Sequence, residues 1–142
     1  MQALELLAPA VGVFLADQLA KWLVARHLPR GEPLLFARWL EIRYTTKRSE
    51  ARRGARPRFA LLLLWCSTAI ILILFVQQGE FFRHVAAKTG LGAALGGAAS
   101  NLCDRMRRGA VIDLLKVGWW PVFNLADVGI TLGATTALLF MR

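Results

Sequence analysis

The chain has 142 residues, of which 56% are hydrophobic, and a formal net charge of +9 at neutral pH. Its length fits a single domain, residues 1–142, and its apolar share exceeds that of an average soluble domain. Ten of its eighteen basic residues lie between Arg26 and Arg58, beside apolar segments. This placement favours anionic lipid headgroups over nucleic acid as the partner of the positive charge.

Four segments approach the length of about 20 apolar residues that a helix needs to cross a bilayer. They are residues 4–24, 59–76, 85–103 and 122–141. They predict an all-α membrane protein with four transmembrane helices and with both termini on the same side. The polar stretch 26–58 is predicted to be a basic loop, and residues 34–45 within it end in β-forming residues. That pattern predicts a short strand pair lying on the membrane.

The last two segments carry further signals. Gly92 and Gly96 are four residues apart on one helix face, a spacing that lets helices pack closely in lipid. Trp119 and Trp120 precede the last segment, and tryptophans of this kind mark a membrane interface. The two cysteines fall inside predicted helices, and no spacing in the chain indicates a metal site or an organic cofactor.

Polar residues inside the apolar segments are candidates for a site, because a charge near hydrocarbon is costly without a partner. Asp17 and Lys21 are four residues apart and share a helix face, which predicts an ion pair. That pair either neutralises itself at the membrane edge or belongs to a site. Asn101 and Asp104 also share a face, with Arg105 adjacent, and favour bracing a neighbouring loop through charge-assisted hydrogen bonds.

Asp113 and Asp127 bracket the loop before the last segment. If the last two helices pack as neighbours, both carboxyls converge near the rim of the bundle. Two carboxylates in contact share a proton, so the pair can activate water as a base and protonate a carbonyl oxygen or leaving amine as an acid. The alternative is a proton relay or cation site. No histidine stands near Ser100 or Cys103 in the sequence, so neither is supported as a nucleophile.

Four motifs carry a resemblance to a known family. In chain order they are Asp17-Gln18-Leu-Ala-Lys21, Asn101-Leu-Cys-Asp104-Arg105, Val111-Ile112-Asp113 and Pro121-Val-Phe123-Asn124-Leu-Ala126-Asp127. From residue 13 to the C-terminus the chain resembles lipoprotein signal peptidase (signal peptidase II). The resemblance implies an intramembrane aspartyl endopeptidase of the bacterial inner membrane, with its active site on the extracytoplasmic side. Such an enzyme removes signal peptides from diacylglyceryl-modified prolipoproteins.

The resemblance also implies roles for single residues. Asp113 and Asp127 would be the catalytic pair. Six polar residues would position that pair or the substrate: Asp17, Lys21, Asn101, Asp104, Arg105 and Asn124. The implied partners are prolipoproteins and membrane lipids, without metal, cofactor or nucleic acid, and the simplest assembly is a monomer.

The chain departs from the family in one region. Members usually carry Asn-x-Gly-Ala-Ala-Phe after the first strand pair, whereas here only Gly54, Ala55 and Phe59 match, at a different spacing. This departure supports an alternative function, a catalytically impaired paralogue that binds lipoprotein precursors or an inhibitor. A third interpretation is a small ion- or proton-conducting bundle. Orientation is also contested, because the positive-inside rule places the basic loops 26–58 and 105–121 in the cytoplasm, opposite to the resemblance.

Overall fold

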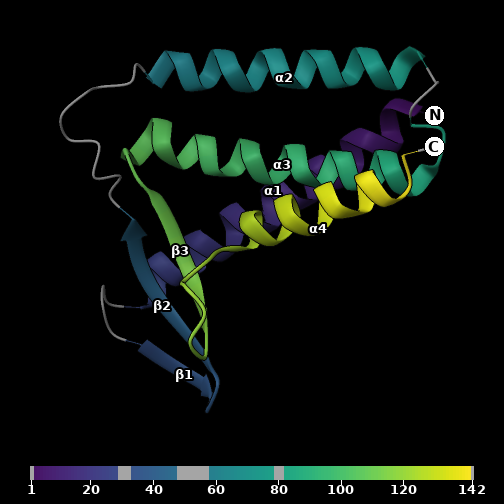
Figure 1. Ribbon diagram of the computed structural model, residues 1–142. Helices are drawn as coiled ribbons and strands as arrows, with labels where there is room; N and C mark the ends of the chain where they lie inside the picture. The colour runs from purple at the N-terminus through teal and green to yellow at the C-terminus, as the bar shows by residue number, and fades with distance from the viewer. Residues whose placement is uncertain (1, 29–32, 48–57, 79–81, 142) are drawn as a thin grey trace.

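The computed structural model describes residues 2–28, 33–47, 58–78 and 82–141. These residues form four helices and three strands: α1 (Gln2–His27), β1 (Pro33–Ala37), β2 (Leu40–Lys47), α2 (Arg58–Gln78), α3 (Val85–Arg108), β3 (Val111–Val117) and α4 (Leu125–Leu139). Helix α3 is central and packs against α1, α2 and α4 (Figure 1). Both termini lie at one end of the bundle, as predicted, and the sheet projects from the other end (Figure 1).

The sheet has three antiparallel strands in the order β1-β2-β3. The sequence predicted only the pair that β1 and β2 form. Strand β3 was missed because its residues, VIDLLKV, are mostly apolar on both faces and do not alternate. It pairs Asp113 with Thr45 and Val117 with Leu40. Asp113 therefore lies within a sheet, and the predicted loop at this position is wrong.

The boundaries of the last two helices differ from the prediction. Helix α4 begins at Leu125, three residues later than expected, because Phe123 bridges to Leu115 and Asn124 caps the helix. Helix α3 continues to Arg108, where Gly109 adopts a left-handed conformation (φ 73°) and its N–H bonds to the carbonyl of Arg105. A left-handed glycine is a common way to end a helix. Asp127 thus lies in the first turn of α4.

Gly92 and Gly96 allow α3 to approach α1 closely. A Cβ atom at Gly92 would collide with the backbone carbonyl of Leu6, and one at Gly96 with that of Ala10. The predicted role of this four-residue spacing in helix packing is confirmed. The close approach places the polar side chains of α1 directly beside those of α3.

Only α1, over Ala3–His27, is long and apolar enough to cross a membrane among the described residues. The apolar stretches Leu62–Leu74 of α2 and Leu125–Leu139 of α4 are shorter. The fold is therefore mostly helical with a small sheet, and its four-span arrangement stays a prediction. Residues 48–57 of the predicted basic loop 26–58, and with them most of the region that departs from the family, lie outside the described residues.

Candidate active site

A buried ion cluster joins α1 to α3. The Nζ atom of Lys21 lies 2.5 Å from Oδ2 of Asp17 and 2.7 Å from Oδ2 of Asp104, and it donates to Oδ1 of Asn101 at 3.3 Å. Lys21, Asp17 and Asp104 are all fully buried. An ammonium group has three hydrogens, so these three acceptors use all of them. The predicted ion pair between Asp17 and Lys21 is confirmed, and Asp104 joins it.

Asp17 connects three helices through its carboxylate. Its Oδ2 accepts a hydrogen bond from Oγ of Ser100 on α3 at 2.6 Å. Its Oδ1 accepts one from the backbone N–H of Ala126 on α4 at 2.9 Å. The first N–H groups of a helix have no partner within the helix, and an acid at that end is favoured by the helix dipole. Asp17 therefore fixes the beginning of α4 against α1.

Asp104 connects α3 to strand β3. Its Oδ1 accepts from Nη1 of Arg108 at 2.8 Å and from Nε2 of Gln18 at 3.2 Å. Its Oδ2 accepts from the backbone N–H of Ile112 at 3.4 Å. Asp104 therefore braces a neighbouring segment, as predicted. Its partner there, Ile112, immediately precedes Asp113.

Arg105 takes no part in this cluster. Its side chain is exposed and makes no hydrogen bond or ion pair with the described residues. The arginine that binds Asp104 is Arg108, one helical turn further on. We missed three contributors in the sequence: Gln18, Ser100 and Arg108. A signal was present, since residues 100, 104 and 108 recur every four positions and share one face of α3.

The two arginines should differ in their effect on stability. Replacing Arg108 with methionine removes a charge-assisted bond to a buried acid, and we expect a loss of about 1 kcal/mol, because Arg108 is itself partly exposed. The same change at Arg105 should leave the free energy of unfolding unchanged. Thermal unfolding of both variants in detergent measures the difference. A larger loss at Arg105 would show that it, and not Arg108, supports Asp104.

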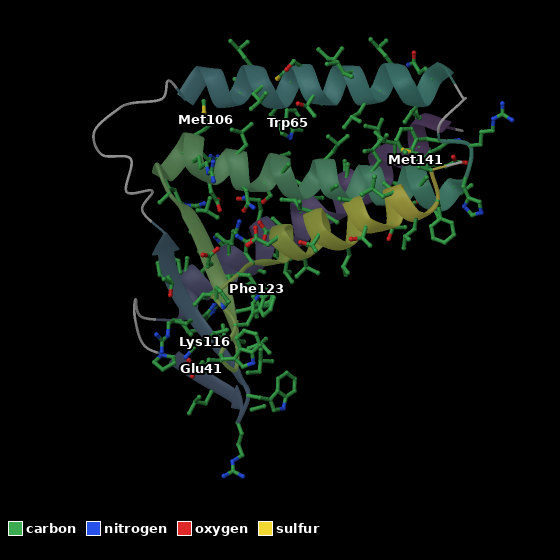
Figure 2. The ribbon with its side chains drawn as sticks, in the orientation of Figure 1. Glu41, Trp65, Met106, Lys116, Phe123 and Met141 are labelled. Carbon is green, nitrogen blue, oxygen red and sulfur yellow. The ribbon has the colours of Figure 1, made fainter. Side chains whose placement is uncertain are left out.

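Two asparagines hold Asp113 and Asp127. Asn124 donates from Nδ2 to Oδ1 of Asp113 at 3.2 Å, and its backbone N–H donates to Oδ2 of Asp127 at 3.3 Å. Its own Oδ1 accepts from the backbone N–H of Asp127 at 2.9 Å, which completes a capping box. Asn101 donates from Nδ2 to Oδ1 of Asp127 at 2.9 Å. Both acids therefore lie around Asn124, next to Phe123 where β3 meets α4 (Figure 2).

The two asparagines also join the acids to the ion cluster. Oδ1 of Asn101 accepts from both Lys21 and Nδ2 of Asn124. The charges of Asp17, Lys21, Asp104 and Arg108 cancel, so this cluster does not neutralise the acids at 113 and 127. Asp113 is 1% exposed, whereas Asp127 is only half-buried. In the described residues no group of three or more His, Cys, Asp or Glu side chains could hold a metal ion.

Fold and site together define a mostly helical protein that has, within its described residues, one membrane-length helix and a pair of acids held beside a small sheet. The family model described as "Signal peptidase (SPase) II" matches residues 9–142. The chain belongs to the signal peptidase II family. As a member it is a protease of the aspartic type and a membrane protein.

Individual relatives agree with this assignment. A lipoprotein signal peptidase from Rhodococcus jostii (strain RHA1) is 38% identical over 139 residues, covering 91% of this chain and 68% of the relative. One from Polynucleobacter necessarius subsp. necessarius (strain STIR1) is 37% identical over 145 residues, covering 94% and 86%. Two solved bacterial membrane enzymes, at 22% and 21% identity, have TM-scores of 0.80 and 0.79. Each alignment covers 93% of this chain, with 88% and 84% of the solved chains. These two enzymes have the same fold as this chain.

Proposed function

We propose that this protein is an endopeptidase that removes signal peptides from diacylglyceryl-modified prolipoproteins, with Asp113 and Asp127 as its catalytic pair. The substrate class follows from the name that its relatives carry, lipoprotein signal peptidase. The observation that carries the catalytic assignment is the shared contact of both acids with Asn124. The chain's other two aspartates, Asp17 and Asp104, each form an ion pair with Lys21 instead.

In this mechanism one carboxylate takes a proton from the attacking water as that water adds to the scissile carbonyl. The other carboxyl protonates the carbonyl oxygen, which gives a tetrahedral intermediate. As the C–N bond breaks, this second acid takes its proton back from a hydroxyl of the intermediate, and the first acid gives the proton it took from water to the leaving amine. Asn101 and Asn124 fix the orientation of the acids, and reactions of this kind are sensitive to small misplacements. Asp17, Lys21 and Asp104 act through these asparagines and through β3, so they are positioning residues.

We place the protein in the bacterial inner membrane as a multi-pass monomer, with the acids at the extracytoplasmic end. Strand β3, which carries Asp113, and the beginning of α4, which carries Asp127, lie with the sheet at the end of the bundle opposite to the termini (Figure 1). Helix α2 packs on α3 and exposes much of its length, including Leu63 (69%) and Leu64 (64%). Such apolar faces are suited to lipid tails. A lipid-anchored substrate can then reach the acids laterally from the bilayer.

The proposal is tested with purified protein in detergent and two forms of one precursor, with and without the diacylglyceryl group on cysteine. We expect cleavage of the lipidated form alone, immediately before the modified cysteine, as measured by mass spectrometry of both products. Expression in a strain depleted of its own peptidase should restore precursor processing. Binding of the lipidated precursor without cleavage, and without restored processing, would instead support the impaired paralogue, whose basis is the altered region 44–59.

A further inference from the structure

The far end of the sheet exposes three tryptophans. Trp39 is 63% exposed, Trp119 89% and Trp120 55%. Tryptophan carries a large apolar surface and is seldom left so open to water, whereas membrane interfaces concentrate it at the level of the headgroups. We call Trp39, Trp119 and Trp120 the sheet tip. The proposed reaction assigns these residues no role.

Two turns build the sheet tip and hold it as one unit. The turn between β1 and β2 contains Trp39, and the turn after β3 contains Trp119. The backbone N–H of Gly118 donates to the carbonyl of Trp39 at 2.9 Å and joins the two turns. The rings of Trp119 and Trp120 meet edge to face, with their centroids 5.5 Å apart. The tip is therefore a fixed apolar surface, and it projects beyond the helices (Figure 1).

The sheet tip is connected to the acids along β3. Val117, Trp119, Trp120 and Phe123 line an apolar hollow of about 300 Å³. Val117 and Asp113 lie on the same face of the strand, about 13 Å apart along it. Phe123 immediately precedes Asn124, the residue that contacts both acids. The tip and the acids are thus linked through β3 and Phe123, so a shift of the tip in a bilayer would be passed on to the acids.

Charge at this end of the molecule complements anionic lipid. Among the described residues near the sheet, the exposed charged side chains are cationic: Arg26, Arg38, Arg105, Arg107 and Arg108, of which Arg108 is also paired with Asp104. Arg26 also lies over the ring of Trp22 at 5.2 Å. Every described aspartate and glutamate, by contrast, is buried or half-buried. Basic residues next to a membrane are attracted to anionic headgroups, each by about 1 kcal/mol.

We propose that the sheet tip docks into the interface of a bilayer that contains anionic phospholipid, and that this docking holds Asp113 and Asp127 at the depth of the scissile bond. The docking itself rests on exposed tryptophans and charge. Its consequence for cleavage rests on the proposed function. Docking would also explain why basic residues occur at this end of the molecule, which the positive-inside rule would otherwise place in the cytoplasm.

Fluorescence tests the docking directly. A variant that keeps Trp119 and carries phenylalanine at Trp22, Trp39, Trp65 and Trp120 is reconstituted into vesicles of phosphatidylethanolamine and phosphatidylglycerol. Lipids brominated near the headgroup end of the acyl chain should quench Trp119 emission more strongly than lipids brominated near the chain terminus. Acrylamide in the water should quench it less than in the unfolded protein. Strong acrylamide quenching without bromine quenching would place the tip in water and overturn the proposal.

Cleavage tests the consequence. The triple variant Trp39→Ser, Trp119→Ser and Trp120→Ser should lose at least about tenfold in cleavage rate in vesicles, because small misplacements of reacting groups are costly. In detergent micelles, where no bilayer fixes depth, it should cleave like the unaltered protein. Leu139→Ser, an exposed apolar residue at the opposite end, is the matched control. An equal rate for the triple variant and the control in vesicles would contradict the proposal.

The two proposals can fail separately. If the unaltered protein cleaves neither in detergent nor in vesicles, the proposed function is wrong, while quenching of Trp119 still reports docking. If it cleaves in both but Trp119 stays in water, the docking is wrong and the proposed function stands.

Discussion

Replacing either Asp113 or Asp127 with asparagine should lower kcat for precursor cleavage by about 10²- to 10⁴-fold, the usual contribution of general acid–base catalysis. An amide has nearly the shape of a carboxylate, but it neither accepts a proton from water nor donates one to a leaving amine. KM should change little, because the change does not alter the apolar surfaces that receive the substrate. Kinetics on a lipidated precursor in detergent measure both parameters.

The structure indicates that these variants fold. An asparagine at 113 keeps an oxygen that can accept from Nδ2 of Asn124. At 127 it keeps one acceptor for either Asn101 or the backbone N–H of Asn124, so at most one hydrogen bond is lost, at a cost of about 1 kcal/mol. Glu41→Gln is the matched control, since Glu41 lies on the sheet near Lys116 (Figure 2). Near-normal kcat in either variant would contradict the acid pair as the source of catalysis.

Replacing Lys21 with methionine should cost about 3–5 kcal/mol, because it leaves Asp17 and Asp104 buried without their common cation. That is a large part of the 5–15 kcal/mol, roughly, by which a domain is stable. We expect a low yield of folded protein and a markedly lower Tm in detergent. The same substitution at Lys116, a partly exposed residue 3.5 Å from Glu41, should cost about 0–1 kcal/mol.

A combined variant separates charge from packing. Adding Asp17→Asn and Asp104→Asn to Lys21→Met removes the two uncompensated carboxylates, and this should recover part of the lost Tm. If Lys21→Met alone unfolds at the temperature of the unaltered protein, the two acids are not charged in the folded state. No recovery in the combined variant would mean that the lost stability comes from packing.

The sequence predicted the helices well because their signal is local. Long apolar runs identify α1 and α2. The four-residue spacing of Asp17 and Lys21 predicts their contact, because residues four apart share a helix face. Strand β3 was missed because only its partner β2, more than sixty residues earlier in the chain, makes it a strand. The beginning of α4 was misplaced because an apolar run continues through Phe123, while the cap at Asn124 ends the extended segment.

The sequence predicted which residues form the site better than it predicted which of them contact one another. The motifs named most of its residues, yet the sequence alone did not show that Asn124 contacts both Asp113 and Asp127. The motif also suggested Arg105 where the structure uses Arg108, since adjacency in a motif does not specify which helix face points inward. A further ion pair, between Lys88 and Glu5 at 3.0 Å, was not predicted, because its two members lie on different helices.

The side-chain amide of Asn124 has more acceptors than hydrogens. Its oxygen must face the N–H of Asp127, so Nδ2 points toward the carbonyl of Ile112 at 3.1 Å, Oδ1 of Asn101 at 3.1 Å and Oδ1 of Asp113 at 3.2 Å. Two hydrogens cannot serve three oxygens at full strength. In the proposed mechanism, when Asp113 gains a proton, the Nδ2–H of Asn124 that it shared can strengthen its hydrogen bond to Oδ1 of Asn101 without movement of any heavy atom. Under the proposed function, the pair would therefore change its protonation within a rigid frame, which would keep reorganisation between successive cleavages small.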